Sequence, residues 1–109
     1  MIMTDCIVAL TTWPDEAGAK AFAQHLLEKR LAACVNLLPA MQSFYTWQGE
    51  FCSGTEHQLI IKTRREHAEA IETVLKTMHP YELAEFLTLP IDSGSPAFLN
   101  WINESTHAE

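Results

Sequence analysis

The apolar residues predict a buried strand followed by an amphipathic helix at the beginning of the chain. The stretch DCIVALTT, residues 5–12, is nearly continuous apolar sequence, which suits a strand covered on both faces. We expect a helix to follow, with Pro14 in its first turn and with Asp15 and Glu16 where the helix dipole favours anions. Apolar residues then recur at the spacing of one helix face, at Ala19, Phe22, Ala23 and Leu26.

Three extended stretches follow. Residues 32–39 and 42–50 read as extended chain that bends near Pro39 and turns at Gly49. The third stretch, EHQLIIKT at residues 56–63, is a mostly apolar strand. Because successive side chains of a strand point to opposite faces, one face of the second stretch carries Ser43, Tyr45 and Trp47.

A second helix is predicted to begin with a capping box at Thr63 and Glu66. The helical period continues through Ala68, Ile71, Leu75 and Met78. We expect the helix to stop at His79, because the residue before a proline is disfavoured in the α conformation. The stretch FLTLPI, residues 86–91, is a further strand, and Ser95 with Pro96 marks the start of a short closing helix.

This order predicts a single α+β domain over residues 1–109. It corresponds to a ferredoxin-like βαββαβ arrangement plus a short C-terminal helix. In that arrangement the first and third strands lie in the middle of an antiparallel sheet, and both helices cover one face. The strands CIVAL and LIIK, which carry the longest apolar runs, would take the central places. Since no helix of the chain is left for the other face, we expect subunit contacts there.

Charge and cysteine content narrow the functional classes. The chain has 7 Lys and Arg against 14 Asp and Glu, a formal net charge of −7. Nucleic-acid binding by phosphate neutralisation is therefore not expected. Cys6, Cys34 and Cys52 are odd in number and far apart, which indicates reduced thiols in the cytoplasm. The apolar run from Cys6 to Leu10 is too short to span a bilayer, so no membrane association is expected.

Several segments together resemble the CutA family of divalent-cation tolerance proteins. They are RLAACVNLLPAMQSFYTWQGE, LIIKT, HPYELAE and FLNWI, in the family's order and roughly its spacing, over residues 5–101. The resemblance implies a ferredoxin-like subunit, a tight homotrimer and a fold shared with the PII signalling proteins. It also implies a cytoplasmic bacterial protein linked to copper and other divalent ions.

The chain departs from the family pattern at two positions. Ala84 stands where many members have a second proline after the His-Pro-Tyr-Glu segment. Thr11 matches the position at which some members carry a cysteine, a soft ligand for copper. Cys6 lies five residues earlier, an odd offset that turns its side chain to the opposite face of the strand, so it is no simple substitute.

His79 is the leading metal-ligand candidate, because imidazole binds copper and zinc well, and Glu82 is its nearest carboxylate candidate. Pro80 prevents the helix that would align the two side chains. In extended chain His79 shares a side with Tyr81, whereas Glu82 faces the other way. The alternative interpretation of His79 is a helix C-terminus favoured by the dipole and followed by a proline stop. A trimer could bring a carboxylate of another subunit to His79.

A ligand-binding cleft is the other candidate site. Glu82 and Glu85 could form a polar cleft with Lys62, or Lys62 could form a structural salt bridge at the end of the sheet. Tyr45 and Trp47 could stack on a ligand, or they could fill a subunit interface.

The leading hypothesis is a cytoplasmic homotrimer that binds copper or zinc weakly and takes part in metal-ion tolerance. The alternative is a PII-like signalling trimer that binds a small anionic metabolite in clefts between subunits, with Tyr45, Trp47, Lys62 and Glu82 as its test residues. Shared fold does not imply shared ligand, and no Gly-rich phosphate loop is present. An enzyme is not expected, because no G-x-S-x-G motif or convincing Cys/His pair occurs.

Overall fold

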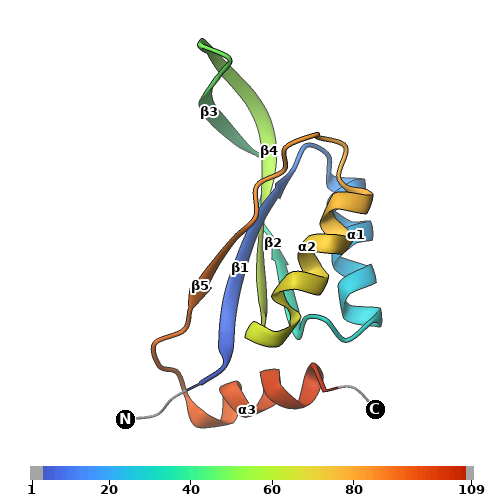
Figure 1. The fold of residues 1–109 in the computed structure, drawn as a ribbon, viewed down its shortest axis with the longest axis vertical. Helices are drawn as coiled ribbons and strands as arrows, with labels where there is room; N and C mark the ends of the chain where they lie inside the picture. Colours follow the sequence, from blue (N-terminus) through green and yellow to red (C-terminus); the bar gives the residue numbers. More distant parts are fainter. Residues whose placement is uncertain (1–3, 108–109) are drawn as a thin grey trace.

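The computed structural model describes residues 4–107, which contain five strands, three α-helices and a short 3₁₀ turn (Figure 1). The strands are β1 (Cys6–Trp13), β2 (Cys34–Leu37), β3 (Met41–Trp47), β4 (Glu50–Arg64) and β5 (Leu87–Pro90). The helices are α1 (Glu16–Glu28), α2 (Ala68–Met78) and α3 (Pro96–Ser105), and the 3₁₀ turn spans Arg65–His67. The mixed α+β class predicted from the sequence is therefore the one observed.

The strands form an antiparallel sheet in the order β2-β4-β1-β5. The middle of the sheet is the long pairing of β1 with β4, in which Ala9 lies opposite Ile61. These two strands carry the longest apolar runs, so the expectation that they occupy the central places agrees with the observed order. Both edge strands, β2 and β5, are only 4 residues long.

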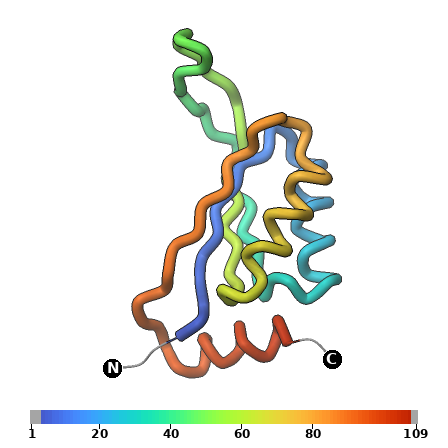
Figure 2. The backbone as a smooth tube through the Cα atoms, in the orientation of Figure 1, coloured from blue at the N-terminus to red at the C-terminus, as the bar shows by residue number. Residues whose placement is uncertain are grey.

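Helices α1 and α2 pack on the same face of the sheet, as predicted (Figures 1 and 2). The helical spacing of the sequence is the reason, because it places apolar side chains on one stripe of each helix. Phe22 and Leu26 of α1 and Ile71 of α2 are fully buried against Ala9 and Ile61 of the sheet. This layer is the main core of the subunit.

Helix α3 corrects the expectation that no helix of the chain meets the other face. Its Leu99 and Ile102 bury Cys6, which lies on that face of β1, at the end of the sheet. Arg64, at the end of β4, donates from Nε to the Thr106 hydroxyl and from an η nitrogen to the Thr106 carbonyl, at 2.8 and 2.9 Å. None of the helices within residues 4–107 covers the rest of the face, over β5 and the middle of β1 (Figure 1).

Strand β4 is a single strand of 15 residues, which joins two stretches that the sequence pattern separated. Its first half pairs with β3 and forms a hairpin that extends beyond the rest of the subunit (Figures 1 and 2). The turn lies at Gln48 and Gly49, whose φ angles are 51° and 80°. Positive φ at both central residues matches the right-handed twist of a two-residue hairpin, and glycine adopts it at little cost.

The predicted starts of two helices were wrong. Thr63 does not cap α2, because it is a fully buried residue of β4 whose hydroxyl donates to the Leu31 carbonyl at 2.6 Å. Pairing with β1 continues to Arg64, so α2 begins only at Ala68, after the 3₁₀ turn. Helix α1 is capped by the Asp15 side chain, which accepts from the Gly18 N–H, and Pro14 therefore precedes the helix instead of lying in its first turn.

Candidate functional site

His79 ends α2 and is bonded to the protein through both ring nitrogens. It is 8% exposed, and its backbone leaves the helix with a ψ of 137°. Nε2 lies 2.8 Å from the Thr12 carbonyl, which can only accept, so Nε2 carries the proton and donates it. Nδ1 lies 3.0 Å from the Tyr81 amide and accepts its N–H. The imidazole is therefore the neutral Nε2–H tautomer, with no free lone pair.

The His79 ring also belongs to a series of aromatic contacts that runs outward from the core. Phe22 stacks on Trp13 with ring centroids 4.9 Å apart, Trp13 contacts His79 at 4.4 Å, and His79 contacts Tyr81 at 5.0 Å. The expectation that His79 and Tyr81 share a side is confirmed. The series holds the segment 80–85, which follows α2, against the main core.

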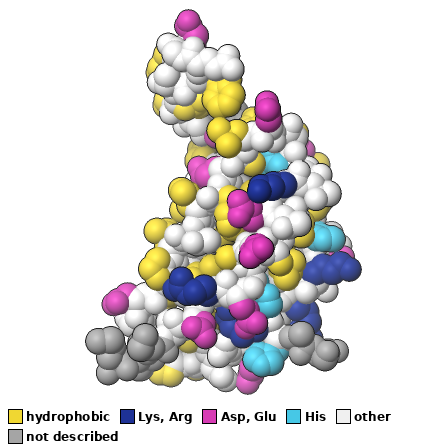
Figure 3. Space-filling view, in the orientation of Figure 1, with side chains coloured by type: hydrophobic (Ala, Val, Ile, Leu, Met, Phe, Trp, Pro, Cys, Tyr) yellow, Lys and Arg dark blue, Asp and Glu magenta, His cyan; other side chains and the backbone are white. Residues whose placement is uncertain are grey.

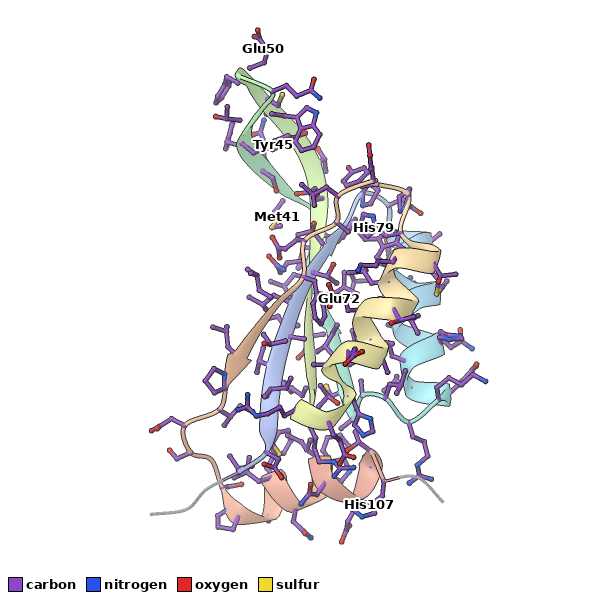
Figure 4. The ribbon with its side chains drawn as sticks, viewed as in Figure 1. Met41, Tyr45, Glu50, Glu72, His79 and His107 are labelled. Carbon is purple, nitrogen blue, oxygen red and sulfur yellow. The ribbon has the colours of Figure 1, made fainter. Side chains whose placement is uncertain are left out.

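A groove of about 940 Å³ lies between the hairpin and the segment that follows His79. One wall is β3, from Met41 and from residues 43–47, and the opposite wall is residues 80–85. Its floor consists of Thr12, Glu56 and Gln58. In Figure 4, Met41 and Tyr45 lie on the hairpin and His79 lies at the end of α2 beneath the segment that closes the opposite wall. We call this cavity the hairpin groove.

The hairpin groove contains most of the residues predicted for a site. Tyr45 and Trp47 line it from one side, and Glu82 and Glu85 line it from the other. His79 is not among the lining residues. Its two ring nitrogens are bonded to the Thr12 carbonyl and to the Tyr81 N–H, behind the wall that carries Tyr81. The groove therefore gathers the aromatic and carboxylate candidates, and His79 holds one wall in place.

Lys62 is not in this groove. It lies in β4 opposite Val8 and Cys34, and its ammonium is 6.0 Å from the centroid of the Phe98 ring on α3. Within one subunit, Lys62 therefore does not share a cleft with Glu82 and Glu85. Within one subunit, the described lining residues of the groove therefore include no Lys or Arg, and the predicted clefts between subunits stay a prediction.

The carboxylates of the groove are held to different degrees. Glu56 Oε2 accepts from the Thr12 hydroxyl at 3.1 Å, and Glu85 Oε2 accepts from the Gln58 amide at 3.1 Å. The same amide group donates to the Thr11 carbonyl at 2.7 Å, which ties the floor to β1. Glu82 is exposed and forms no hydrogen bond or ion pair with the residues that the structure describes.

The pKa of Tyr81 is raised above its ordinary value of 10.0, first by burial and then by the negative charge of Glu56 and by Tyr45. Tyr81, Glu56 and Tyr45 all line the hairpin groove. The sequence pattern singled out neither Glu56 nor Tyr81 as a site residue. Glu56 comes close to this segment only because β4 continues into the hairpin.

Thr11 is fully buried, and its hydroxyl donates to the Glu85 carbonyl at 2.6 Å. This bond attaches the segment 80–85 to β1. Cys6 lies on the other face among Leu99 and Ile102, as the odd offset between the two residues predicts. A thiolate ligand at this part of β1 is therefore excluded.

Comparisons with known proteins agree with this fold. The model of the family described as "CutA1 divalent ion tolerance protein" matches residues 7–105. A divalent-cation tolerance protein CutA from Pectobacterium atrosepticum is 45% identical over 103 residues, covering 94% of each chain. This chain belongs to the CutA1 family. The resemblance seen in the sequence is thereby confirmed.

Solved structures of CutA1 proteins superpose closely on this chain. CutA from Xylella fastidiosa has a TM-score of 0.92 and 38% identity, and the match covers 95% of this chain and 100% of that one. A protein named periplasmic divalent cation tolerance protein CutA, from Archaeoglobus fulgidus, has a TM-score of 0.90 and 36% identity, covering 94% and 99%. The described fold is therefore the CutA1 fold.

The family name raises the question of which residues could hold a divalent ion. Among residues 4–107, no three His, Cys, Asp or Glu side chains gather closely enough to hold one. Binding by His79 would displace the Tyr81 N–H or the Thr12 carbonyl from the imidazole. Glu82 is the candidate ligand that needs no such exchange. None of the helices in the described part of the chain has the length and apolar content that crossing a bilayer takes.

Proposed function

We propose that this CutA1 protein acts in divalent-cation tolerance as a cytoplasmic homotrimer that binds copper or zinc weakly. The observation that carries this function is the acidic lining of the hairpin groove, where Glu56, Glu82 and Glu85 stand apart from one another and no Lys or Arg occurs among the described lining residues. Carboxylate oxygens are ligands for divalent ions, and the net charge of −7 attracts cations to the surface. Membership of a divalent-ion tolerance family supports the same function.

Glu82 is the first ligand in this proposal, because it is exposed at the groove and has no competing bond. His79 joins only when Nδ1 exchanges the Tyr81 N–H for the ion, since Nδ1 is now occupied at 3.0 Å. This exchange has a cost, and the carboxylates are spread around the groove, so the affinity is weak. We expect the ion to be bound without transformation of any substrate.

The homotrimer is supported by the sheet face that α1 and α2 leave uncovered. Leu87 and Leu89 of β5 are 56% and 51% exposed there, next to the partly exposed Val8 and Leu10 of β1. Figure 3 shows hydrophobic side chains along this side of the molecule and on the hairpin. A contiguous exposed apolar face of this kind is typical of a subunit interface.

The cytoplasmic location is supported by the cysteines. Cys6, Cys34 and Cys52 are all free thiols, as expected in a reducing compartment. Separation of cell fractions with an antibody against the protein tests the location. Recovery with periplasmic marker proteins would contradict it.

Calorimetric titration of Cu²⁺ and of Zn²⁺ into metal-free protein tests the metal function. We expect saturable binding at one site per subunit or fewer, weakened at least about tenfold, or about 1.4 kcal/mol, by Glu82→Gln. Glu69→Gln, which changes an exposed carboxylate on α2 outside the groove, serves as the matched control and should bind as the unmodified protein does.

His79→Ala in the same titration decides whether the imidazole is a ligand. A tenfold loss in a variant whose trimer remains intact would assign the ion to His79 as well as Glu82. Absence of saturable binding of both ions to the unmodified protein at millimolar concentration would refute the metal function.

A further inference from the structure

We propose that the hairpin groove binds an organic ammonium ion, a ligand that needs the aromatic walls as well as the carboxylates. Lys62 lies elsewhere, and the charged side chains among the lining residues are three glutamates. The charge of this lining is therefore complementary to a cation. This inference concerns the same groove as the metal function but does not rest on it, because the metal function makes no use of the aromatic walls.

The walls of the groove present aromatic side chains to its interior. Tyr45 and Trp47 of β3 stand on one side and Tyr81 on the other, and each is between 46% and 49% exposed. Their faces carry negative partial charge, which attracts a cation within about 6 Å of the ring centre. Substituted ammonium ions gain from this attraction and also remove apolar surface from water.

The carboxylates add a full negative charge without forming a compact metal cage. Glu56 and Glu85 each accept one hydrogen bond from a neutral side chain, which leaves their charge uncompensated. The raised pKa of Tyr81, which Glu56 helps to produce, agrees with a negative potential at this place. The glutamates lie on the floor and on one wall, so the charge is spread over the groove.

The hairpin groove is large enough to admit a small organic molecule. Small-molecule pockets are roughly 300–1,000 Å³, and the groove measures about 940 Å³. A hydrated metal ion gains little from tyrosine and tryptophan walls, and no three-ligand cluster of His, Cys, Asp or Glu exists in residues 4–107. A diffuse cation with apolar substituents uses both kinds of surface.

Both walls are fixed before any ligand arrives. The β3 wall is paired with β4 along its length, from Met41 opposite Glu56 to Trp47 opposite Glu50. The Tyr81 wall is held by the bond from its N–H to His79, and His79 is held by Thr12. Preformed walls reduce the entropy lost on binding. His79 is thus a positioning residue for this site.

A comparison of choline with 3,3-dimethyl-1-butanol tests the inference, because the alcohol has nearly the same shape without the charge. Both are titrated calorimetrically into the protein in its native oligomeric state. We expect choline to bind saturably and at least about tenfold more tightly than the alcohol. Equal affinity for the two compounds would overturn the inference. So would the absence of saturable choline binding up to about 10 mM, a dissociation constant that corresponds to a binding free energy of about −2.7 kcal/mol.

Variants assign the binding to the groove. Trp47→Ala should weaken choline binding at least fivefold, whereas Trp101→Ala, which removes a similarly exposed tryptophan from α3, should leave it unchanged. Glu56→Gln changes the floor of the groove and leaves both aromatic walls intact. It should weaken the binding of choline but not that of the alcohol. This second variant remains informative if Trp47→Ala changes the oligomeric state. Equal loss in Trp47→Ala and Trp101→Ala, or no loss in Glu56→Gln, would contradict the assignment.

Parallel titrations with Zn²⁺ separate this inference from the metal function. Binding of Zn²⁺ without binding of choline would refute the organic-cation site and leave the metal function standing. Choline binding that Trp47→Ala abolishes, in a protein that does not bind Zn²⁺, would support the organic-cation site and count against the metal function.

Discussion

The imidazole of His79 connects three parts of the fold that are far apart in the sequence. It donates to Thr12 of β1, accepts from Tyr81, and packs on Trp13 next to the core. A histidine before a proline at the end of a helix is correctly predicted to stop that helix. Its hydrogen-bond partners could not be predicted from the sequence, because Thr12 lies 67 residues earlier in the chain.

We expect His79→Ala to destabilise the protein by about 2–4 kcal/mol, because two hydrogen bonds are lost and the buried Thr12 carbonyl is left without its donor. Denaturant unfolding with EDTA present measures this loss. His25→Ala, which changes a partly exposed histidine of α1, serves as the control and should cost less than about 1 kcal/mol. A loss that disappears in EDTA would show that the residue stabilises through a metal instead.

Tyr81 gives a pH prediction, because its folded-state pKa is raised above the ordinary 10.0. The neutral phenol is favoured in the folded protein, so its contribution to stability is complete below pH 10 and is lost as the pH rises through the raised pKa. Spectrophotometric titration should show a phenol ionising above the ordinary range, absent in Tyr81→Phe. Glu56→Gln should bring this ionisation to lower pH. If the late step persists in Tyr81→Phe, the assignment is wrong.

The hairpin of β3 and β4 shows how local sequence and long-range pairing share the control of one element. The turn at Gly49 is predicted from the sequence and is confirmed. Ser43, Tyr45 and Trp47, which are predicted to share a face, line the hairpin groove together with Phe44 and Thr46. The continuity of β4 is not predicted, because the polar residues between Glu50 and Thr55 interrupt its apolar pattern. Pairing with β3 keeps that segment extended.

We expect Gly49→Ala to destabilise the protein by about 1 kcal/mol, because a φ of 80° is strained for any residue with a Cβ. Gly54→Ala is the matched control in the same hairpin. Gly54 has no positive φ, and a Cβ there would meet nothing within 4 Å. Its substitution should be neutral or slightly stabilising. Urea unfolding of the two variants makes the comparison, and equal shifts would contradict the role assigned to the turn.

The false capping box illustrates the limit of local motifs at the level of elements. Thr63 and Glu66 have the required spacing, yet β1 pairs with β4 as far as Arg64 and takes Thr63 into the sheet. The Thr63 hydroxyl instead donates a hydrogen bond to the carbonyl of Leu31, in the loop before β2. A short motif predicts a cap only where no longer-range pairing competes for the same backbone.

At the scale of the whole molecule, the exposed apolar residues require an explanation that a single subunit does not provide. Leu87 and Leu89 on β5 are more than half exposed, and Phe44 and Phe51 stack at 6.1 Å on the projecting hairpin. Helix α3 covers Cys6 at one end of this face but leaves its middle open. Association of several copies would bury this surface.

We expect light scattering at micromolar concentration to give three times the chain mass of 12.3 kDa. Leu89→Asp should reduce the mass, because it places a charge in the proposed interface. Leu27→Asp changes an exposed leucine of α1 and is the control that should remain trimeric. A mass near 12.3 kDa for the unmodified protein would refute the trimer.

The sequence alone determined the α+β class, the central strands, the end of α2 at His79 and the start of α3 at Ser95. Each depends on the spacing of apolar residues or on proline and capping chemistry within a few neighbours. Only the tertiary structure decided that Glu56 and Tyr81 line the same groove, that Lys62 lies outside it, and that both His79 nitrogens are occupied. Those relations arise from strand pairing between distant segments. The spacing of apolar residues predicts where strands lie but not which of them pair or in which register.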